Sequence, residues 1–140
     1  MDRLLEEVNT GPFYLRQTAI ADMVVGAIRY RVEHLGHYDL HAFVVMPNHV
    51  HILIQPLVPL AILTKSLKGY TARRANAALG RTGLPFWQAE GYDHQVRDGR
   101  ELAQIRRYIE ENPVRAGLAG VASRSRWSSA WEAAQATAAS

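Results

Sequence analysis

The sequence contains no cysteine, which excludes disulfide bonds, thiolate metal sites and cysteine nucleophiles. It has no apolar run long enough to span a membrane, and residues 1–7 carry acids where a secretory signal would carry an apolar segment. We therefore expect a cytoplasmic protein. With 140 residues, 48% of them hydrophobic, the chain suits one domain with a hydrophobic core.

Acidic residues are scarce in the second half of the chain. Residues 65–126 hold twelve basic and six acidic residues, whereas residues 1–64 hold four basic and six acidic ones. Residues 60–86 have no acid at all. A basic excess of this kind favours a polyanionic partner, for which nucleic acid is the first candidate. A solvated basic surface explains the same excess equally well.

Two histidines stand out because apolar strand patterns surround them. A Pro-Asn turn signal lies between two runs rich in Val and Ile, which predicts a hairpin with strands over residues 38–46 and 49–55. Side chains two apart on a strand share a face, so His49 and His51 point to the same side, with about 6.5–7 Å between their α-carbons. Such a pair can bind a metal ion, although a His-x-His pair is often coincidence.

Three other segments have helical patterns. Apolar residues recur at spacings of three and four over residues 18–35, and a second helix is expected after Pro59, ending before Gly80. A third helix is expected to begin at an Asp98 cap and to end before Pro113. We also predict a short strand over residues 92–96, an unpatterned segment over 1–17, a main domain over 18–131 and a frayed Ala-rich tail over 132–140.

Two pairs of residues have alternative interpretations. Tyr108 and Asn112 are four apart on the third helix and share a face, with about 5–6 Å between their β-carbons. Patterning alone favours a core role for Tyr108 and a C-terminal capping role for Asn112. The adjacent Phe86 and Trp87 either pack on the core, which is the expected role, or stack on an unpaired base.

Six stretches, in this order and spacing, resemble the REP-associated tyrosine transposases of the single-tyrosine HUH transposase superfamily. The resemblance covers roughly residues 18–131. The stretches are residues 46–54, 66–70, 86–88, 92–98, 108–118 and 127–130.

The resemblance implies an α+β, ferredoxin-like (RRM-like) fold, with an antiparallel sheet and helices on one face. It implies metal-dependent cleavage and rejoining of single-stranded DNA through a 5′-phosphotyrosine, often at hairpins formed by repeated palindromes. His49 and His51 match the metal ligands, Tyr108 the nucleophile and Asn112 the third ligand. The implied cofactor is Mg²⁺ or Mn²⁺, although Zn²⁺ also suits these ligands. The implied partners are single-stranded or hairpin DNA, with a homodimer allowed and no membrane.

This chemistry is consistent with the residue types. Two imidazoles and a carboxamide are neutral ligands, so a bound dication keeps its full charge for a phosphate. A phenol with a pKa of about 10 is a weak nucleophile and needs a proton acceptor, for which His94 and a metal-bound water are the candidates. The expected DNA contacts are Lys65, Lys68, Arg73, Arg74, His94, Arg97, Arg115, Arg124, Arg126 and Trp127. The last three alternatively fold back as a cover.

One feature departs from the family pattern. The family begins with a strand that lies beside the strand of the histidines, and residues 1–17 show no such strand. Its loss would leave an unpaired sheet edge. Truncation, pairing with another chain and decay of the gene each explain this, and we expect an upstream extension to raise thermal stability.

Three functions are compatible with the sequence. The first is a DNA-cleaving and strand-joining enzyme, and intact His49, His51 and Tyr108 favour it. The second is a catalytically silent or domesticated protein that binds structured single-stranded DNA. The third is a structural metal-binding domain or an unrelated small α+β protein, against which the basic second half argues.

Overall fold

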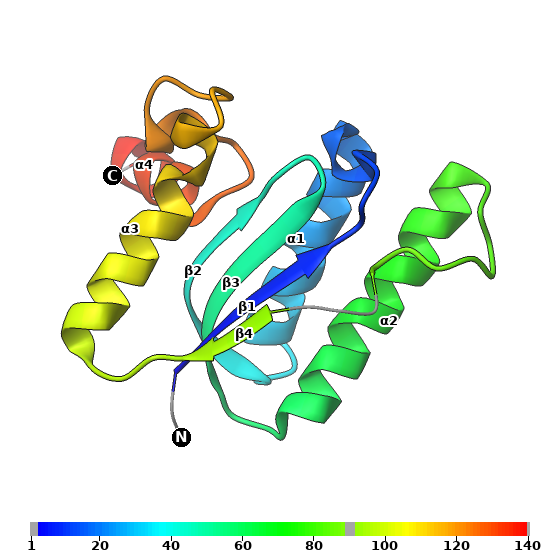
Figure 1. Ribbon diagram of the computed structural model, residues 1–140, viewed down its shortest axis with the longest axis horizontal. Helices are drawn as coiled ribbons and strands as arrows, with labels where there is room; N and C mark the ends of the chain where they lie inside the picture. Colours follow the sequence, from blue (N-terminus) through cyan, green and yellow to red (C-terminus); the bar gives the residue numbers. More distant parts are fainter. Residues whose placement is uncertain (1–2, 89–91, 140) are drawn as a thin grey trace.

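The computed structural model describes residues 3–88 and 92–139 (Figure 1). Its helices and strands are β1 (Leu4–Asn9), η1 (Tyr14–Arg16), α1 (Thr18–Glu33), β2 (Tyr38–Val45), β3 (His49–Pro56), α2 (Leu60–Leu79), β4 (Tyr92–Gln95), α3 (Gly99–Arg115), η2 (Ala122–Arg124) and α4 (Ser129–Ala139).

Four antiparallel strands form one sheet in the order β2-β3-β1-β4. The chain order β1-α1-β2-β3-α2-β4 gives the ferredoxin-like α+β fold that the resemblance implies. Helices α1 and α2 cover one face of the sheet, as expected. The other face is not open, because α3 packs on it through Ile109, against Leu5, Val44 and Leu53.

Strand β1 corrects the expectation of a missing first strand. It lies between β3 and β4 and pairs with both, so the edge beside the histidines is not unpaired. The side chains of β1 alternate between the two faces of the sheet, and this explains why its sequence does not show a strand pattern. Leu4 and Val8 pack with the α1 and α2 side of the core, Leu5 packs on the opposite side, and Glu6 and Glu7 between them obscure the apolar pattern. The expected gain from an upstream extension therefore loses its basis.

The two ends of the C-terminal region also differ from expectation. Helix α3 passes through Pro113 and ends only at Arg115. Pro113 lacks the N–H that would bond to the Ile109 carbonyl, but its buried side chain and the helical backbone after it keep the last residues in the helix. Residues 132–139 are not frayed in this structure but belong to α4. In contrast, the ends of α1 and α2 follow the predicted patterns, and Gly80 closes α2 in the left-handed conformation (φ 68°).

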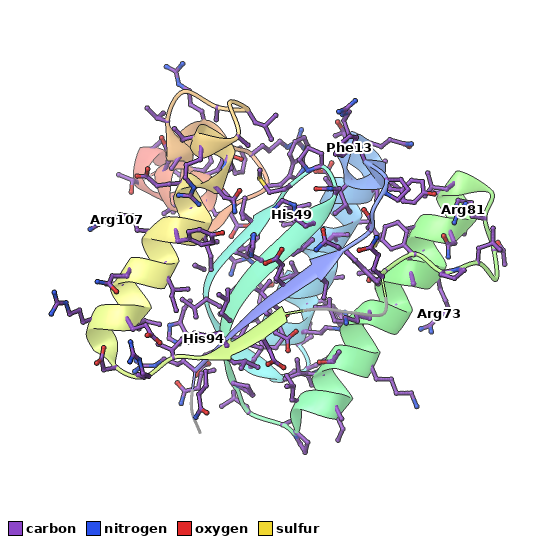
Figure 2. The ribbon with its side chains drawn as sticks, in the orientation of Figure 1. Phe13, His49, Arg73, Arg81, His94 and Arg107 are labelled. Atoms are coloured by element: carbon purple, nitrogen blue, oxygen red, sulfur yellow. The ribbon has the colours of Figure 1, made fainter. Side chains whose placement is uncertain are left out.

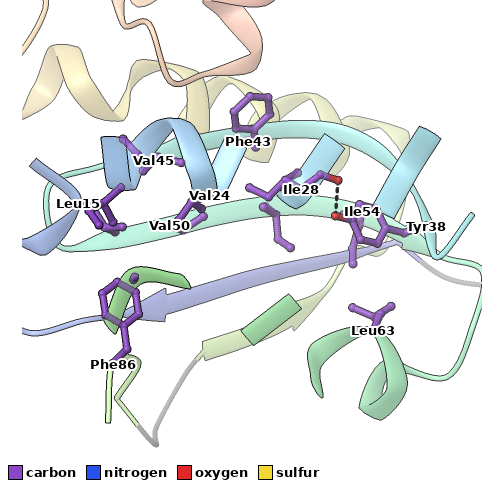
Figure 3. Close-up of a cluster of buried hydrophobic side chains, with 14 residues drawn as sticks. Leu15, Val24, Ile28, Tyr38, Phe43, Val45, Val50, Ile54, Leu63 and Phe86 are labelled. Atoms are coloured by element: carbon purple, nitrogen blue, oxygen red, sulfur yellow. Dashed lines mark hydrogen bonds between the residues drawn. The ribbon is translucent and has the colours of Figure 1, made fainter. Parts of the chain in front are cut away.

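The main core lies between the sheet and the two helices α1 and α2 (Figure 3). Tyr38 is fully buried within it, and its hydroxyl donates to the carbonyl oxygen of Ile28 at 2.8 Å. Phe86 is buried in the same core, and the indole N–H of Trp87 donates to Thr71 Oγ1 at 2.9 Å. This confirms the core role expected for the aromatic pair.

The segment before α4 covers the outer edge of β2. The Val45 N–H donates to the carbonyl of Trp127 at 2.8 Å, and Val44 forms an isolated bridge with Ser128. These bonds satisfy part of a strand edge that would otherwise be open to pairing with other chains. In residues 3–88 and 92–139, no helix combines the length and apolar character that crossing a membrane requires.

Candidate functional site

The two histidines lie near the start of β3, on the sheet face that α3 covers. His49 follows the hairpin turn directly, and Figure 2 shows it on the sheet. The two imidazole rings are 4.9 Å apart between centroids and nearly perpendicular. The alternation along the strand therefore brings both rings to one place, as the sequence predicts.

His51 is the more deeply buried of the two rings. Its residue is 2% exposed, and its Nδ1 atom has no hydrogen-bond partner in the described part of the chain. Burial, reinforced by His49 and Arg115, lowers the pKa of His51 to about 4. The ring is therefore neutral at pH 7 and keeps a lone pair for a ligand role.

His49 is half-buried and is oriented by the turn before it. Its Nδ1 atom lies 2.8 Å from Asn48 Oδ1, while Asn48 Nδ2 donates to the Gly11 carbonyl at 3.5 Å. Burial lowers the pKa of His49, and the carboxylate of Glu7 opposes that shift. Asn48 thus holds the imidazole in place in addition to forming the turn.

Helix α3 supplies the other residues of this site. Its buried Ile109 and Pro113 fix the helix on the sheet, and this places the intervening Asn112 against His51. Asn112 Nδ2 donates to His51 Nε2 at 3.1 Å. The Tyr108 ring lies 5.9 Å from the His51 ring between centroids. The structure therefore brings together all four residues that the resemblance singles out.

Tyr108 is not the core residue that helical patterning alone favours, because it is 49% exposed. Arg115 holds it from the next turns of the helix. The Arg115 guanidinium lies 4.4 Å from the centre of the Tyr108 ring, and its Nη2 donates to the Tyr108 carbonyl at 2.6 Å. This leaves an accessible phenol with a cation on its ring face.

The donor set suits a divalent cation even though it is not rich in acids. Within residues 3–88 and 92–139, no three His, Cys, Asp or Glu side chains are grouped so that they could hold a metal ion. The two neutral imidazoles and the Asn112 carboxamide could hold a metal ion if the amide rotates, so that its oxygen replaces its nitrogen on the side of His51 Nε2. The buried, unpartnered Nδ1 of His51 indicates that this ring is not placed for core packing alone.

Glu7 lies at the site, although it is not among the residues that the sequence indicates. It pairs directly with His51 across the β1–β3 register, and its Oε2 lies 3.7 Å from His51 Nδ1. No local pattern marks it. Recognition of β1 and its register with β3 would have placed it here.

The four expected DNA-binding cations of α2 lie away from this site. Lys65, Lys68, Arg73 and Arg74 come from α2, which packs on the opposite face of the sheet. Figure 2 shows Arg73 on α2 and His49 on the sheet. The structure therefore does not bring these four residues together with the histidines.

His94 and Arg97 are held at the start of α3. His94 Nε2 lies 3.0 Å from Glu101 Oε1, and Arg97 Nε donates to Glu101 Oε2 at 2.9 Å. The hydrogen bonds from the backbone of Arg97 and from His94 lower the pKa of Glu101 to about 2. Glu101 is seven residues before Tyr108, about 10 Å along the helix axis. This arrangement does not support His94 as the proton acceptor for the phenol.

A cationic groove lies at the β2–β3 hairpin turn, which His49 directly follows in the chain. Leu15, Val45, Met46, Pro47 and Leu118 line it with Arg16, Arg124, Ser125, Arg126 and Trp127. Of the cations, Arg16 was not expected. Trp127 Nε1 donates to Asp22 Oδ1 at 2.8 Å and Arg126 contacts Asp22 Oδ2 at 3.4 Å, so this segment folds back on α1. Arg124 is exposed beside the groove.

Comparison with known proteins identifies the family. Residues 16–112 match the profile of the family described as Transposase IS200 like, and this stretch includes the histidine pair, Tyr108 and Asn112. The protein belongs to the IS200-like transposase family. The resemblance noticed in the sequence is thus confirmed at the level of the family.

Two solved structures resemble this IS200-like transposase. A REP-associated tyrosine transposase bound to a REP hairpin superposes with a TM-score of 0.68, over 91% of this chain and 75% of the other, at 19% identity. At that identity the likeness concerns the fold alone. A protein of Deinococcus radiodurans, provisionally described as a transposase, superposes with a TM-score of 0.55 at 25% identity, over 79% of this chain and 89% of the other.

One curated relative also matches. An uncharacterised protein of Haemophilus influenzae is 29% identical over a 94-residue alignment, and the match covers 51% of this chain and 52% of that protein. The chain therefore spans about half the length of this relative.

Proposed function

We propose that this protein cuts and rejoins single-stranded DNA with Tyr108 as nucleophile, in a divalent-metal-dependent reaction. The observation that carries the proposal is the convergence of three elements of the site. The Tyr108 ring lies 5.9 Å from the His51 ring, the two histidine rings are 4.9 Å apart, and Asn112 contacts His51. A strand and a helix that are far apart in sequence thus bring a phenol to a pair of imidazoles.

His49, His51 and Asn112 would hold Mg²⁺ or Mn²⁺. When bound, the cation polarises the non-bridging oxygens of the scissile phosphate. Burial keeps His51 neutral and therefore able to bind a cation at pH 7. Asn48 and the strand backbone hold His49 in a fixed orientation, which limits the reorganisation that binding requires.

Tyr108 would act on the phosphate from the helix side. Its oxygen attacks phosphorus as the phenol proton passes to solvent, which the half-exposed ring allows. The bond to the 3′ oxygen breaks, that oxygen takes up a proton, and a 5′-phosphotyrosine forms. The reverse attack by a 3′-hydroxyl rejoins a strand without ATP, because the new ester keeps the energy of the broken bond. Arg115, on the ring face, orients the phenol and lies close enough to contact a phosphate.

Hairpin DNA is the proposed substrate class. The fold neighbour with the higher TM-score is bound to a REP hairpin, and this chain carries cations on both faces of the sheet. The groove at the hairpin turn would accept the single strand that enters the site, and the α2 cations would contact backbone further away.

The test is the formation of a covalent adduct. Wild-type protein is incubated with a single-stranded hairpin oligonucleotide and Mn²⁺, and a denaturing gel is used to detect DNA-linked protein. Tyr108→Phe should abolish the adduct. Tyr70→Phe is the matched control, because Tyr70 is also a partly exposed tyrosine on a helix, and it should leave the adduct unchanged.

Two outcomes would contradict this proposal. An adduct that survives Tyr108→Phe would show that another residue is the nucleophile. If wild type forms no adduct on a panel of hairpins but still shifts them on a native gel, the protein is a binding protein for structured single-stranded DNA and not a nuclease.

A further inference from the structure

In both histidines of β3, the Nδ1 atom faces a side-chain oxygen of another residue. The Nδ1 atom of His49 lies 2.8 Å from Asn48 Oδ1, and the Nδ1 atom of His51 lies 3.7 Å from Glu7 Oε2. The first contact is a hydrogen bond, and the second is slightly too long to be one. The proposed reaction uses the other ring nitrogens and so far gives Glu7 no role.

The contact with Asn112 assigns the proton on His51. A neutral imidazole has one nitrogen that donates and one that accepts. In this structure the Asn112 amide presents Nδ2 to His51 Nε2, so in the metal-free protein with this amide orientation Nε2 is the acceptor and the proton of the neutral ring lies on Nδ1. The amide would turn its oxygen inward only to hold a cation. The Nδ1–H group is buried, and it has no hydrogen-bond partner in the described part of the chain. A buried donor without a partner is costly, so a nearby acceptor is expected to complete the arrangement.

The sheet register brings the side chain of Glu7 to this nitrogen. Strand β1 runs antiparallel to β3 with Glu7 opposite His51, so the two side chains share a face. The Glu7 side chain is 32% exposed, whereas that of His51 is 3% exposed. The carboxylate therefore needs only a small movement from 3.7 Å to come within hydrogen-bonding distance of the buried nitrogen. The preceding residue, Glu6, points to the opposite face, where it lines a gap with Leu67 and Lys68 of α2.

We propose that Glu7 is a positioning residue that accepts the Nδ1 proton of His51 and so keeps the Nε2 lone pair of that ring available to a divalent cation. Asn48 acts in the same way on His49. Both rings are then held with unprotonated Nε2 atoms. A carboxylate on the far nitrogen also raises the basicity of an imidazole ligand and strengthens its bond to a metal. This consequence rests on the proposed metal-dependent function, whereas the proton assignment does not.

The experiment has one measurement without metal and one with metal, both on the full chain. Nitrogen-15 NMR of the metal-free protein reports which nitrogen of His51 is protonated. We expect Nδ1–H in wild type and in Glu6→Gln, and a mixture of tautomers in Glu7→Ala. Mn²⁺ titration should show a 10- to 100-fold loss of affinity in Glu7→Ala, a smaller loss in Glu7→Gln, which keeps an acceptor without the charge, and a change within about twofold in Glu6→Gln.

Glu6→Gln is a close control, because it removes the same charge from the neighbouring position on the other face of the strand. Thermal unfolding of each variant checks that it is folded, and Glu7→Gln replaces Glu7→Ala if the alanine variant is not. Protonation of wild-type His51 at Nε2 overturns the proposal. So does Mn²⁺ affinity in a folded Glu7→Ala variant within about twofold of wild type. If wild type binds no divalent cation, the proposed function fails, and the NMR result still decides the role of Glu7.

Discussion

Glu6 and Glu7 are chemically identical neighbours that β1 places in opposite environments. Glu7 faces the histidines, whereas Glu6 is half-buried between the sheet and α2. Burial and the nearby Asp93 raise the pKa of Glu6, and Lys68 partly offsets that shift. A carboxylate with a raised pKa is destabilising when it is ionised, because the folded state holds the proton more tightly than the unfolded chain does.

This difference predicts a pH-dependent gain from Glu6→Gln. The pKa of Glu6 is 4.5 in the unfolded chain and higher in the folded protein. In wild type, ionisation of Glu6 therefore lowers the free energy of unfolding as the pH rises from 4.5 through the folded pKa. The amide removes that loss, so the variant should unfold at a higher temperature at pH 7, by at most about 4 °C, since solvent screens a half-exposed group. The gain should vanish as the pH approaches 4.5. Thermal unfolding between pH 8 and 4.5 measures it.

The exposed Glu111 of α3 provides the control for this measurement. Glu111→Gln should follow the wild-type curve throughout the pH range. A gain in Glu6→Gln that persists at pH 4.5 would show that the amide acts by packing or hydrogen bonding and not by removing a charge.

Residue roles were only partly predictable from the sequence. The spacing of His49 and His51 on one strand predicted their shared face, because that depends on local geometry alone. The position of Tyr108 beside them came from the family resemblance, since patterning favoured a buried ring. Glu7 was missed because its place opposite His51 depends on strand pairing between residues far apart in the chain.

The elements with local start and stop signals were the ones that the sequence predicted well. Asp98 caps α3 by accepting the Glu101 N–H at 2.9 Å, as its capping signature indicates. Strand β1 was not predicted, because it is held by neighbours on both sides and not by its own composition. The end of α3 was placed too early because Pro113 removes one backbone bond, to the Ile109 carbonyl, without stopping the helix, which continues to Arg115.

The C-terminal segment depends on another long-range contact, between Ser129 and β2. Ser129 Oγ donates to Glu110 Oε2 at 2.6 Å and accepts the Phe43 N–H at 3.1 Å. One hydroxyl thus joins α4, α3 and the outer edge of β2. No periodic pattern predicts such a contact.

Ser129→Ala should lower the free energy of unfolding by about 1–3 kcal/mol, because it leaves the N–H of Phe43 and the Glu110 carboxylate without this partner. Ser123→Ala, at an exposed position in η2, should change it by less than about 0.5 kcal/mol. Urea unfolding of both variants measures the difference. Equal stabilities would show that the covering segment does not depend on this hydroxyl.

At the scale of the whole molecule, the basic residues are divided between two regions, the groove at the β2–β3 hairpin turn and helix α2. Arg16, Arg124 and Arg126 lie at the groove beside the hairpin turn, while the α2 cations lie beyond the sheet from the histidines. The charge run of residues 60–86 therefore predicted a basic surface but not its distance from the site. The two groups of cations belong to different elements, and charges further apart than the Debye length, about 8 Å at physiological ionic strength, act almost independently, so we expect the two groups to contact different parts of a bound DNA.

Charge reversal in each region should separate these contributions. Arg124→Glu should weaken binding of a short single strand of about six nucleotides, because that strand occupies the site and its groove. Arg73→Glu makes the same change in charge on α2 and should leave the short strand unaffected, but it should weaken binding of a long hairpin. For each lost phosphate contact, the slope of log affinity against log salt should fall in magnitude by about 0.7 to 0.9.

Fluorescence anisotropy of labelled oligonucleotides across a salt series measures both effects, and the Tyr108→Phe background prevents cleavage. If Arg73→Glu weakened the six-nucleotide strand as much as Arg124→Glu does, the α2 face would have to lie on the path of the strand into the site. The groove and helix α2 would then form one continuous binding region and not two. The comparison therefore tests whether the single strand stays in the groove or also reaches helix α2.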